Sequence, residues 1–152
     1  MSIVQTSCSV FAQNLLNGNE NSTTGTYYIA LYTGNASLNN TTTAYTPVNE
    51  VVGTGYTAGG KALTINVTPT VDNTNNSVYI SFANANWTPA AFTCRGALVY
   101  NYVTKAACFI LNFGSDKTCL NSFTVQFPTA TSSSAILSIG SYTSSYVSSS
   151  GD

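Results

Sequence analysis

The chain has 152 residues, of which four are lysine or arginine, five are aspartate or glutamate and none is histidine, so its formal net charge is −1. Histidine is the usual general base near neutral pH and the commonest metal ligand, so its absence argues against most enzymes and metal centres. A chain with this charge has no basic stripe to neutralise phosphates, which argues against a nucleic-acid partner.

The first predicted element is a short helix over residues 6–16. Phe11 and Leu15 form an apolar pair four residues apart, and Gly18 is a plausible stop signal. We interpret residues 1–25 as an N-terminal arm that carries this helix. Phe11 and Leu15 are candidate interface residues, because such an arm is a natural clamp for a neighbouring molecule.

From residue 26 onward the pattern predicts strands. Residues 63–67, 77–82 and 123–127 alternate apolar and polar side chains, as strands with one wet face do. Three other runs are apolar on nearly both faces and must be covered on both, by the opposite sheet and by either the N-terminal helix or another subunit. These runs are residues 27–32, 95–100 and 106–113. Two further strands are expected at 135–139 and, in short form, at 51–52.

Strands separated by turn-rich segments, with one helix, predict an all-β fold. We expect a jelly-roll-like antiparallel β-sandwich of about eight strands over residues 26–140. Residues 54–60 are rich in glycine and read as a flexible loop, and residues 101–105 read as a hairpin loop. Residues 141–152 are rich in serine and are interpreted as a tail that orders only against a partner.

The four cysteines form no Cys-x-x-Cys pair, and no histidine could complete a zinc site with them. Buried free thiols are the favoured interpretation, with a disulfide among the last three as the alternative. The start of the chain shows no basic segment followed by an apolar run, so synthesis in a reducing compartment is expected. The cysteines are Cys8, Cys94, Cys108 and Cys119.

The carboxylates and lysines predict no catalytic residue, no cofactor and no metal site. No spacing of the five acidic residues suggests a catalytic pair. The oxygen-rich run 72–76 lacks the glycine and terminal glutamate of a calcium loop, so a turn is favoured. Gly60 and Lys61 are followed by Ala62, where a phosphate loop would need a hydroxyl. No apolar run reaches the roughly 18–20 residues of a membrane span.

Arg95 is the only arginine and opens an apolar strand. It reads either as an ordinary surface charge or as the partner of Asp116 or Glu50, within the fold or across a subunit boundary. An arginine–carboxylate pair fixes geometry through two parallel hydrogen bonds. Arg95 and Asp116 are therefore candidate interface residues.

We expect most of the ten tyrosines to lie at the rim of the core, but tyrosine is also common at interfaces. Trp87 and Tyr56 are candidates for an exposed aromatic surface. Such side chains could contact a protein partner or stack on sugars, which leaves a glycan-binding interpretation open.

An ordered set of segments resembles a family of small virion structural proteins of tailed bacteriophages. The likeness spans roughly residues 27–139. The segments are Tyr28-Ile-Ala-Leu-Tyr-Thr33, Thr43-Ala-Tyr-Thr46, Asn49-Glu-Val51, Gly53-Thr-Gly-Tyr-Thr-Ala-Gly-Gly60, Trp87-Thr88, Arg95-Gly-Ala-Leu-Val-Tyr-Asn101, Phe113-Gly-Ser-Asp-Lys117 and Phe123-Thr-Val-Gln-Phe-Pro128. The cysteines at positions 94, 108 and 119 depart from the pattern.

The resemblance implies a phage particle component that is not an enzyme. The first hypothesis is a capsid decoration or cement protein, a homotrimer on the capsid surface of the virion that binds the major capsid protein and stabilises the shell. It would be made in the bacterial host cytoplasm and would bind neither nucleic acid nor membrane. The alternative is a head-fibre or tail-appendage module that binds a host receptor or glycan.

Overall fold

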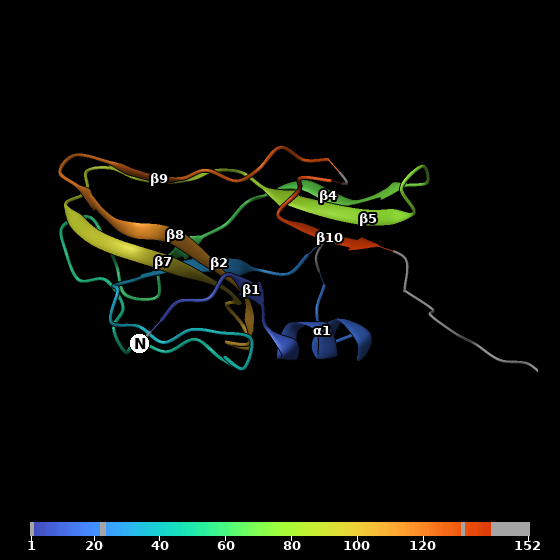
Figure 1. Cartoon of the computed structure of the whole chain (residues 1–152), viewed down its shortest axis with the longest axis horizontal. Helices are drawn as coiled ribbons and strands as arrows, with labels where there is room; N and C mark the ends of the chain where they lie inside the picture. The colour runs from blue at the N-terminus through green and yellow to red at the C-terminus, as the bar shows by residue number, and fades with distance from the viewer. Residues whose placement is uncertain (1, 22–23, 132, 141–152) are drawn as a thin grey trace, which may run out of the picture.

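A computed structural model describes residues 2–21, 24–131 and 133–140, and it shows antiparallel sheets with one short helix (Figure 1). The expectation of an all-β sandwich is confirmed. The expected tail, residues 141–152, lies outside the described residues. No helix within the described ranges is long and apolar enough to cross a bilayer.

The main sheet has five strands in the order β1-β8-β7-β2-β3, and every neighbouring pair is antiparallel. Its centre is the hairpin of β7 and β8, joined by the loop expected at residues 101–105. The strand β2 matches the expected residues 27–32, whereas β7 and β8 are longer than expected. The bounds are β1 Thr6–Ser7, β2 Tyr27–Tyr32, β3 Lys61–Ala62, β7 Phe92–Asn101 and β8 Ala107–Cys119.

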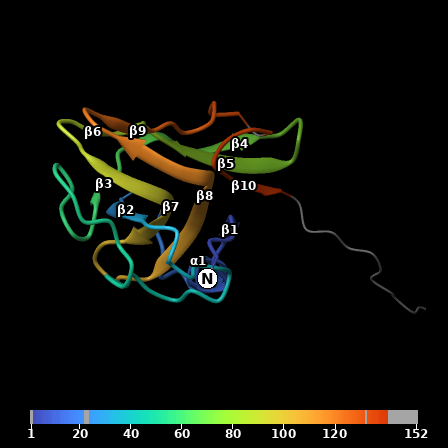
Figure 2. The same ribbon diagram turned by 60° about the vertical axis from the view of Figure 1, so that its left-hand side comes forward.

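The opposite layer consists of a three-stranded sheet, β10-β5-β4, and the two-stranded ribbon β6–β9. The ribbon lies over β7 and β8, and the three-stranded sheet extends beyond the end of the main sheet (Figure 1 and Figure 2). The strand β6 follows β5 after two residues and was not foreseen, because residues 83–91 carry little alternation. The bounds are β4 Ile65–Asp72, β5 Ser77–Phe82, β6 Ala85–Trp87, β9 Phe123–Val125 and β10 Leu137–Gly140.

The inner core fills the space between the two layers and is rich in aromatic rings. Phe82 contacts Tyr27 edge-on at a centroid distance of 5.9 Å and also packs against Phe109 and Phe127. Ile29 in β2 is completely buried there. Burying a side chain of this size contributes roughly 1.5–3 kcal/mol relative to leaving it exposed, so this layer contact is the main source of stability.

The outer face of β2, β7 and β8 carries a second apolar cluster, the outer core. Leu98 and Ile110 lie beneath Ile3 of the N-terminal arm and Leu38 of the loop over residues 33–50. Ile3 and Leu38 form a parallel bridge, so the arm and the loop are tied together as one cover. The sequence predicted that both apolar faces of these strands are covered. The opposite layer covers the inner face, and the arm and loop, rather than the helix, cover the outer face.

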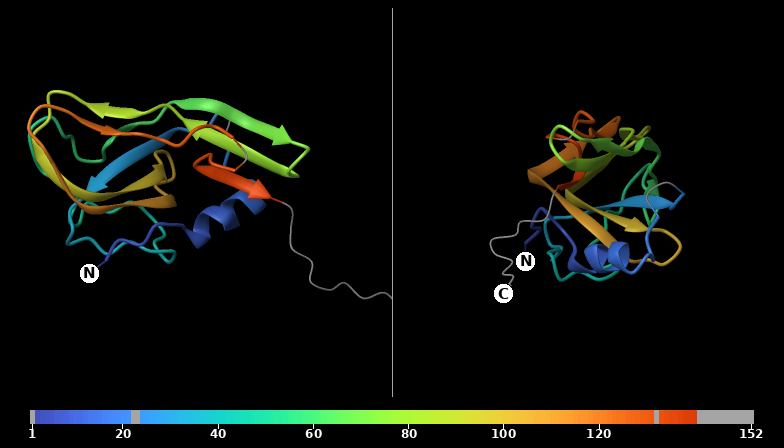
Figure 3. Two further views of the ribbon diagram at one scale, coloured as in Figure 1. Left: turned by 45° about the horizontal axis from the view of Figure 1, so that its top comes forward. Right: turned by 90° about the vertical axis from the view of Figure 1, so that its right-hand side faces the viewer.

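The helix α1 spans Ser9–Leu16, and Thr6–Ser7, expected to be helical, instead join the sheet as β1. The helix ends where Gly18 takes a positive φ of 74°. The Gly18 amide donates to Leu15 O and the Asn19 amide to Asn14 O, which is the Schellman pattern that a glycine makes easy. Figure 3 shows α1 at one end of the sandwich, close to β10.

Two loops differ from expectation. Residues 51–52 form no strand, although Glu50 makes an isolated bridge to Tyr32 and the Val51 amide donates to Leu31 O. Residues 54–60, expected to be flexible, are held by hydrogen bonds from Tyr56 and Gly59 to the Glu50 carboxylate. These residues pass over the end of the inner core, so the loop forms part of the packed structure.

Candidate interaction surface

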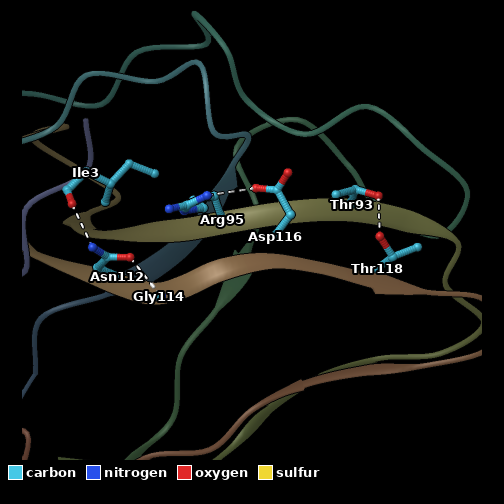
Figure 4. A network of polar contacts seen from close by, with 7 residues as sticks. All are labelled: Ile3, Thr93, Arg95, Asn112, Gly114, Asp116 and Thr118. Atoms are coloured by element: carbon cyan, nitrogen blue, oxygen red, sulfur yellow. Dashed lines mark hydrogen bonds and ion pairs between the residues drawn. The ribbon is translucent and has the colours of Figure 1, made fainter. Parts of the chain in front are cut away.

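The outer face of the β7–β8 hairpin changes character along its length. It is apolar beneath the arm and loop, and it is polar beyond them. We name this second part the polar face (Figure 4). The loop borders the polar face at Gly34, where an added Cβ would lie 3.3 Å from Asp116 Oδ1. It consists of Thr93, Arg95, Asn112, Asp116 and Thr118. The ladder is irregular here, because the register shifts between the pairs Cys94–Lys117 and Gly96–Asn112. Three of the five side chains are uncharged, so another protein surface could contact them at a smaller desolvation cost than a fully charged face would impose.

Two cross-strand contacts order the polar face. The Thr93 and Thr118 hydroxyls lie 2.8 Å apart, and their backbones are direct partners in the ladder. Asn112 lies at the boundary of the covered region: its side-chain amide donates to Ile3 O at 2.9 Å, and its Oδ1 accepts the Gly114 amide. The N-terminal arm is therefore fastened to the inner end of the polar face.

Arg95 pairs with Asp116, one of the two partners that the sequence suggested. One guanidinium nitrogen lies 3.5 Å from Asp116 Oδ1, and the side chains are 41% and 61% exposed. A pair this exposed contributes at most about 1 kcal/mol to stability. Arg95 and Asp116 are thus in contact and accessible, which suits a role in contacting a partner better than a role in holding the fold.

Glu50, the other possible partner of Arg95, is buried among neutral donors. Its Oε1 accepts the Tyr56 hydroxyl at 2.6 Å and the Gly59 amide at 2.7 Å, and its Oε2 accepts the Tyr45 hydroxyl at 2.6 Å. The Tyr56 hydroxyl in turn accepts the Leu31 amide of β2. One carboxylate therefore joins the loops over residues 44–60 to the main sheet. No sequence motif indicated this cluster, because its members are spread over 29 residues.

Burial governs the ionisation of the tyrosines around Glu50. Desolvation, followed by the nearby Glu50 charge, raises the pKa of Tyr100 to about 12. The pKa values of Tyr32, Tyr45 and Tyr56 are raised in the same direction, again first by burial and then by Glu50. These hydroxyls therefore stay protonated and donate hydrogen bonds at any physiological pH.

A second buried carboxylate, Glu20, ties the arm to the β7–β8 hairpin. Its Oε2 accepts the Tyr27 hydroxyl at 2.9 Å and an Asn101 side-chain amide hydrogen at 3.1 Å. The Asn101 Oδ1 also accepts the Val103 and Thr104 amides and so fixes the hairpin loop. Like Glu50, Glu20 serves the architecture.

All four cysteines are free and buried, which confirms the favoured interpretation. Burial raises the pKa of the Cys8 thiol to about 11 and that of Cys94 to about 12, and it raises the pKa of Cys108 in the same direction. Reactivity belongs to the thiolate, so burial makes these side chains poor nucleophiles.

Trp87 and Tyr56 do not form an exposed aromatic surface. Trp87 is only 5% exposed and packs with Phe123 and Tyr56 in the inner core. The Tyr56 hydroxyl is used by Glu50. The ammonium of Lys61 lies 5.2 Å from the Trp87 ring centroid and donates to Asn86 O. The prediction of an exposed aromatic surface was wrong for Trp87, which packs in the core, and Tyr56 is partly buried against the same cluster.

Phe11 and Leu15 are also core residues. Phe11 is 3% exposed and meets Phe109 edge-on at 6.4 Å, and Leu15 is partly buried against the same cluster. Their placement removes them from the clamp expected of the arm. The exposed apolar residue of the helix is Leu16, which is 90% exposed.

A groove of about 410 Å³ lies between β8 and β9. Leu111 and Phe113 form one side, and Phe123, Val125 and Phe127 form the other. A smaller groove between β1 and β10 continues it. Nothing in the sequence marked these grooves, because they arise only where the two layers fail to meet.

Within the described ranges, no three histidine, cysteine, aspartate or glutamate residues gather as a metal site would require.

Comparison with known proteins gives no further guide to function, since no family model, no curated protein and no solved structure matches the chain.

Proposed function

We propose that this chain is a structural, non-enzymatic component of a bacteriophage particle that acts as a capsid decoration or cement protein. The observation that carries the proposal is the polar face, an exposed surface that combines neutral hydrogen-bonding side chains with one exposed ion pair. The resemblance of the chain's segments to small virion structural proteins supports the same class. The partner would be the major capsid protein, and the working unit would be a homotrimer on the capsid surface.

In the proposed mechanism, many copies of the chain each make weak contacts with the shell, and the free energies of these contacts add up. Each copy would bury the polar face against the shell, where Thr93, Asn112 and Thr118 exchange hydrogen bonds with water for hydrogen bonds with the partner. Each such exchange contributes modestly, about 0.5–1.5 kcal/mol, but many copies act on one shell. A protein that binds only the assembled shell stabilises it by mass action.

The alternative is a fibre or appendage module that binds a glycan. It has less support, because Trp87 is buried and the hydroxyl of the partly buried Tyr56 is bonded to Glu50. The exposed Tyr102 does not replace them. Its ring stacks on Tyr28 at 4.1 Å, and the Lys105 ammonium lies 3.7 Å from its centroid. A sugar would have to displace one of these contacts.

Co-sedimentation with empty phage capsids tests the proposal. Wild-type protein should pellet with the shells, and Thr118→Arg should weaken binding at least tenfold, because it places an unpaired charge within the contact. Thr68→Arg, an equally exposed change on β4, should bind as wild type does. Wild-type protein that ignores capsids but binds host cells or glycans would overturn the proposal in favour of the appendage class.

A further inference from the structure

A hollow of about 350 Å³ opens where β3, the edge strand of the main sheet, meets β6 of the ribbon. Figure 2 shows these two strands at the same side of the molecule. The walls come from the glycine-rich loop over residues 54–60, from Lys61 in β3 and from Asn86 and Trp87 in β6. We name this hollow the lysine pocket. It shares no lining residue with the groove between β8 and β9.

The glycine-rich loop gives the lysine pocket a fixed wall. Gly60 takes a positive φ of 80°, and a Cβ there would collide with Ile29 O of β2. Gly55, with a φ of 81°, approaches Pro89 O equally closely. The hydrogen bonds to the Glu50 carboxylate hold the same loop. The pocket is therefore formed before a ligand binds, which lowers the entropic cost of binding.

Lys61 gives the pocket a positive charge that no described carboxylate neutralises. Its ammonium donates to Asn86 O and lies 5.2 Å from the centroid of the Trp87 ring. Among the residues that the structure describes, the only ion pair is that of Arg95 with Asp116. An ammonium carries three donor hydrogens, so after the bond to Asn86 O it can still donate to an anion.

The backbone of the glycine-rich loop argues against phosphate as that anion. A phosphate-binding loop offers several free amides to the phosphate oxygens. Here the amides of Tyr56, Gly59 and Gly60 already donate within the protein. One ammonium without loop amides suits the single charge of a carboxylate.

Three neutral polar side chains, those of Thr57, Asn86 and Thr88, also line the pocket. All three are exposed, and none makes a side-chain hydrogen bond to another described residue. Hydroxyls and amides of this kind are the usual partners of ligand hydroxyls. We propose that the lysine pocket binds a small carboxylate rich in hydroxyls, the chemistry of a hexuronic acid. The carboxylate would lie on Lys61 and the hydroxyls on the three neutral side chains. This inference does not depend on shell binding.

Fluorescence of the full chain tests the ligand class, because Trp87 is its only tryptophan and lines the pocket. Sodium glucuronate, added at constant ionic strength, should change the emission in a saturable way. Glucose lacks the carboxylate and acetate lacks the hydroxyls, so each should bind roughly tenfold more weakly. No change with glucuronate would overturn the proposal. Equal or tighter binding of acetate or inorganic phosphate would overturn it by showing a simple anion site.

Matched variants test the residues. Lys61→Gln keeps a donor for Asn86 O but removes the charge, so glucuronate should bind roughly tenfold more weakly. Lys117→Gln removes an exposed lysine from β8 and should leave binding unchanged. Thr57→Val removes one exposed hydroxyl and should weaken binding roughly two- to tenfold, with the circular dichroism spectrum unchanged. Equal effects of the two lysine variants, or wild-type affinity in both pocket variants, would contradict the assignment.

Discussion

At the scale of single residues, the chain uses its few charges in two different ways. Glu20 and Glu50 are buried and receive hydrogen bonds from neutral groups, whereas Arg95 and Asp116 are exposed and paired. Buried charge is tolerated only where hydrogen bonds replace water, and the tyrosine hydroxyls around Glu50 provide them. Tyrosine therefore does the work that arginine or lysine does in more highly charged proteins.

This use of tyrosine predicts unfolding in alkali. The pKa of Tyr100 rises from 10 to about 12 on folding, and those of Tyr32, Tyr45 and Tyr56 rise too. A raised pKa in the folded state gives stability that is complete below the unfolded pKa and is lost as the pH climbs through the folded pKa. The free energy of unfolding should therefore fall steeply between pH 10 and 12.

Tyrosinate absorbance and circular dichroism, recorded together during an alkaline titration, check this prediction. Tyrosinate should appear in step with the loss of β structure. Full ionisation of all tyrosines near pH 10, with the sheet signal intact, would show that the hydroxyls around Glu50 are not held by the fold.

At the scale of elements, the long β7–β8 hairpin organises the molecule. It contributes to the inner core on one face, and on the other it carries first the outer core and then the polar face. Close approach of the arm to this hairpin requires Gly96. A Cβ there would lie 2.6 Å from Leu111 O and 2.9 Å from two carbons of Ile3.

Gly96→Ala should consequently destabilise the protein by about 1–3 kcal/mol, the usual cost of an overpacked site. Gly140→Ala provides the matched control, because a Cβ at Gly140 meets no atom within 4 Å and should change stability by less than about 0.5 kcal/mol. Urea unfolding followed by circular dichroism measures both. Equal stabilities for the two variants would mean that the arm does not press on the hairpin.

At the scale of the whole molecule, the fold is three stacked layers: the arm with the loop over residues 33–50, the main sheet, and the smaller sheets. The outer layer has little regular structure and depends on a few anchors. Ile3 is 7% exposed, and its neighbour Val4 is 47% exposed. Only the first of these should matter for holding the outer layer in place.

Ile3→Ala is expected to cost about 2–5 kcal/mol, because it leaves a cavity above Leu98 and Ile110. Val4→Ala should cost less than about 0.5 kcal/mol. Thermal unfolding measures the difference, and binding of a dye specific for exposed apolar surface should rise in the Ile3 variant alone. If both variants match wild type, the outer layer contributes little to stability.

Local patterns in the sequence were enough to predict the class of fold and most of its strands. Alternation identified β5 and β9, and the long apolar run at residues 27–32 identified β2, because burial of one or both faces leaves a direct trace in local order. The glycine stop of α1 and the buried thiols were equally readable. These features depend on residues that are neighbours in the chain.

The contacts between residues that are distant in the chain could not be predicted in this way. The tertiary structure assigned Arg95 to Asp116, gathered Tyr45, Tyr56 and Gly59 around Glu50, and turned Trp87 and Phe11 into the core. It also placed the arm over the outer face and left a groove between β8 and β9. Each of these contacts joins segments that are distant in the chain. Sequence patterns do not show which distant segments meet, because one aromatic or charged residue is compatible with several such contacts.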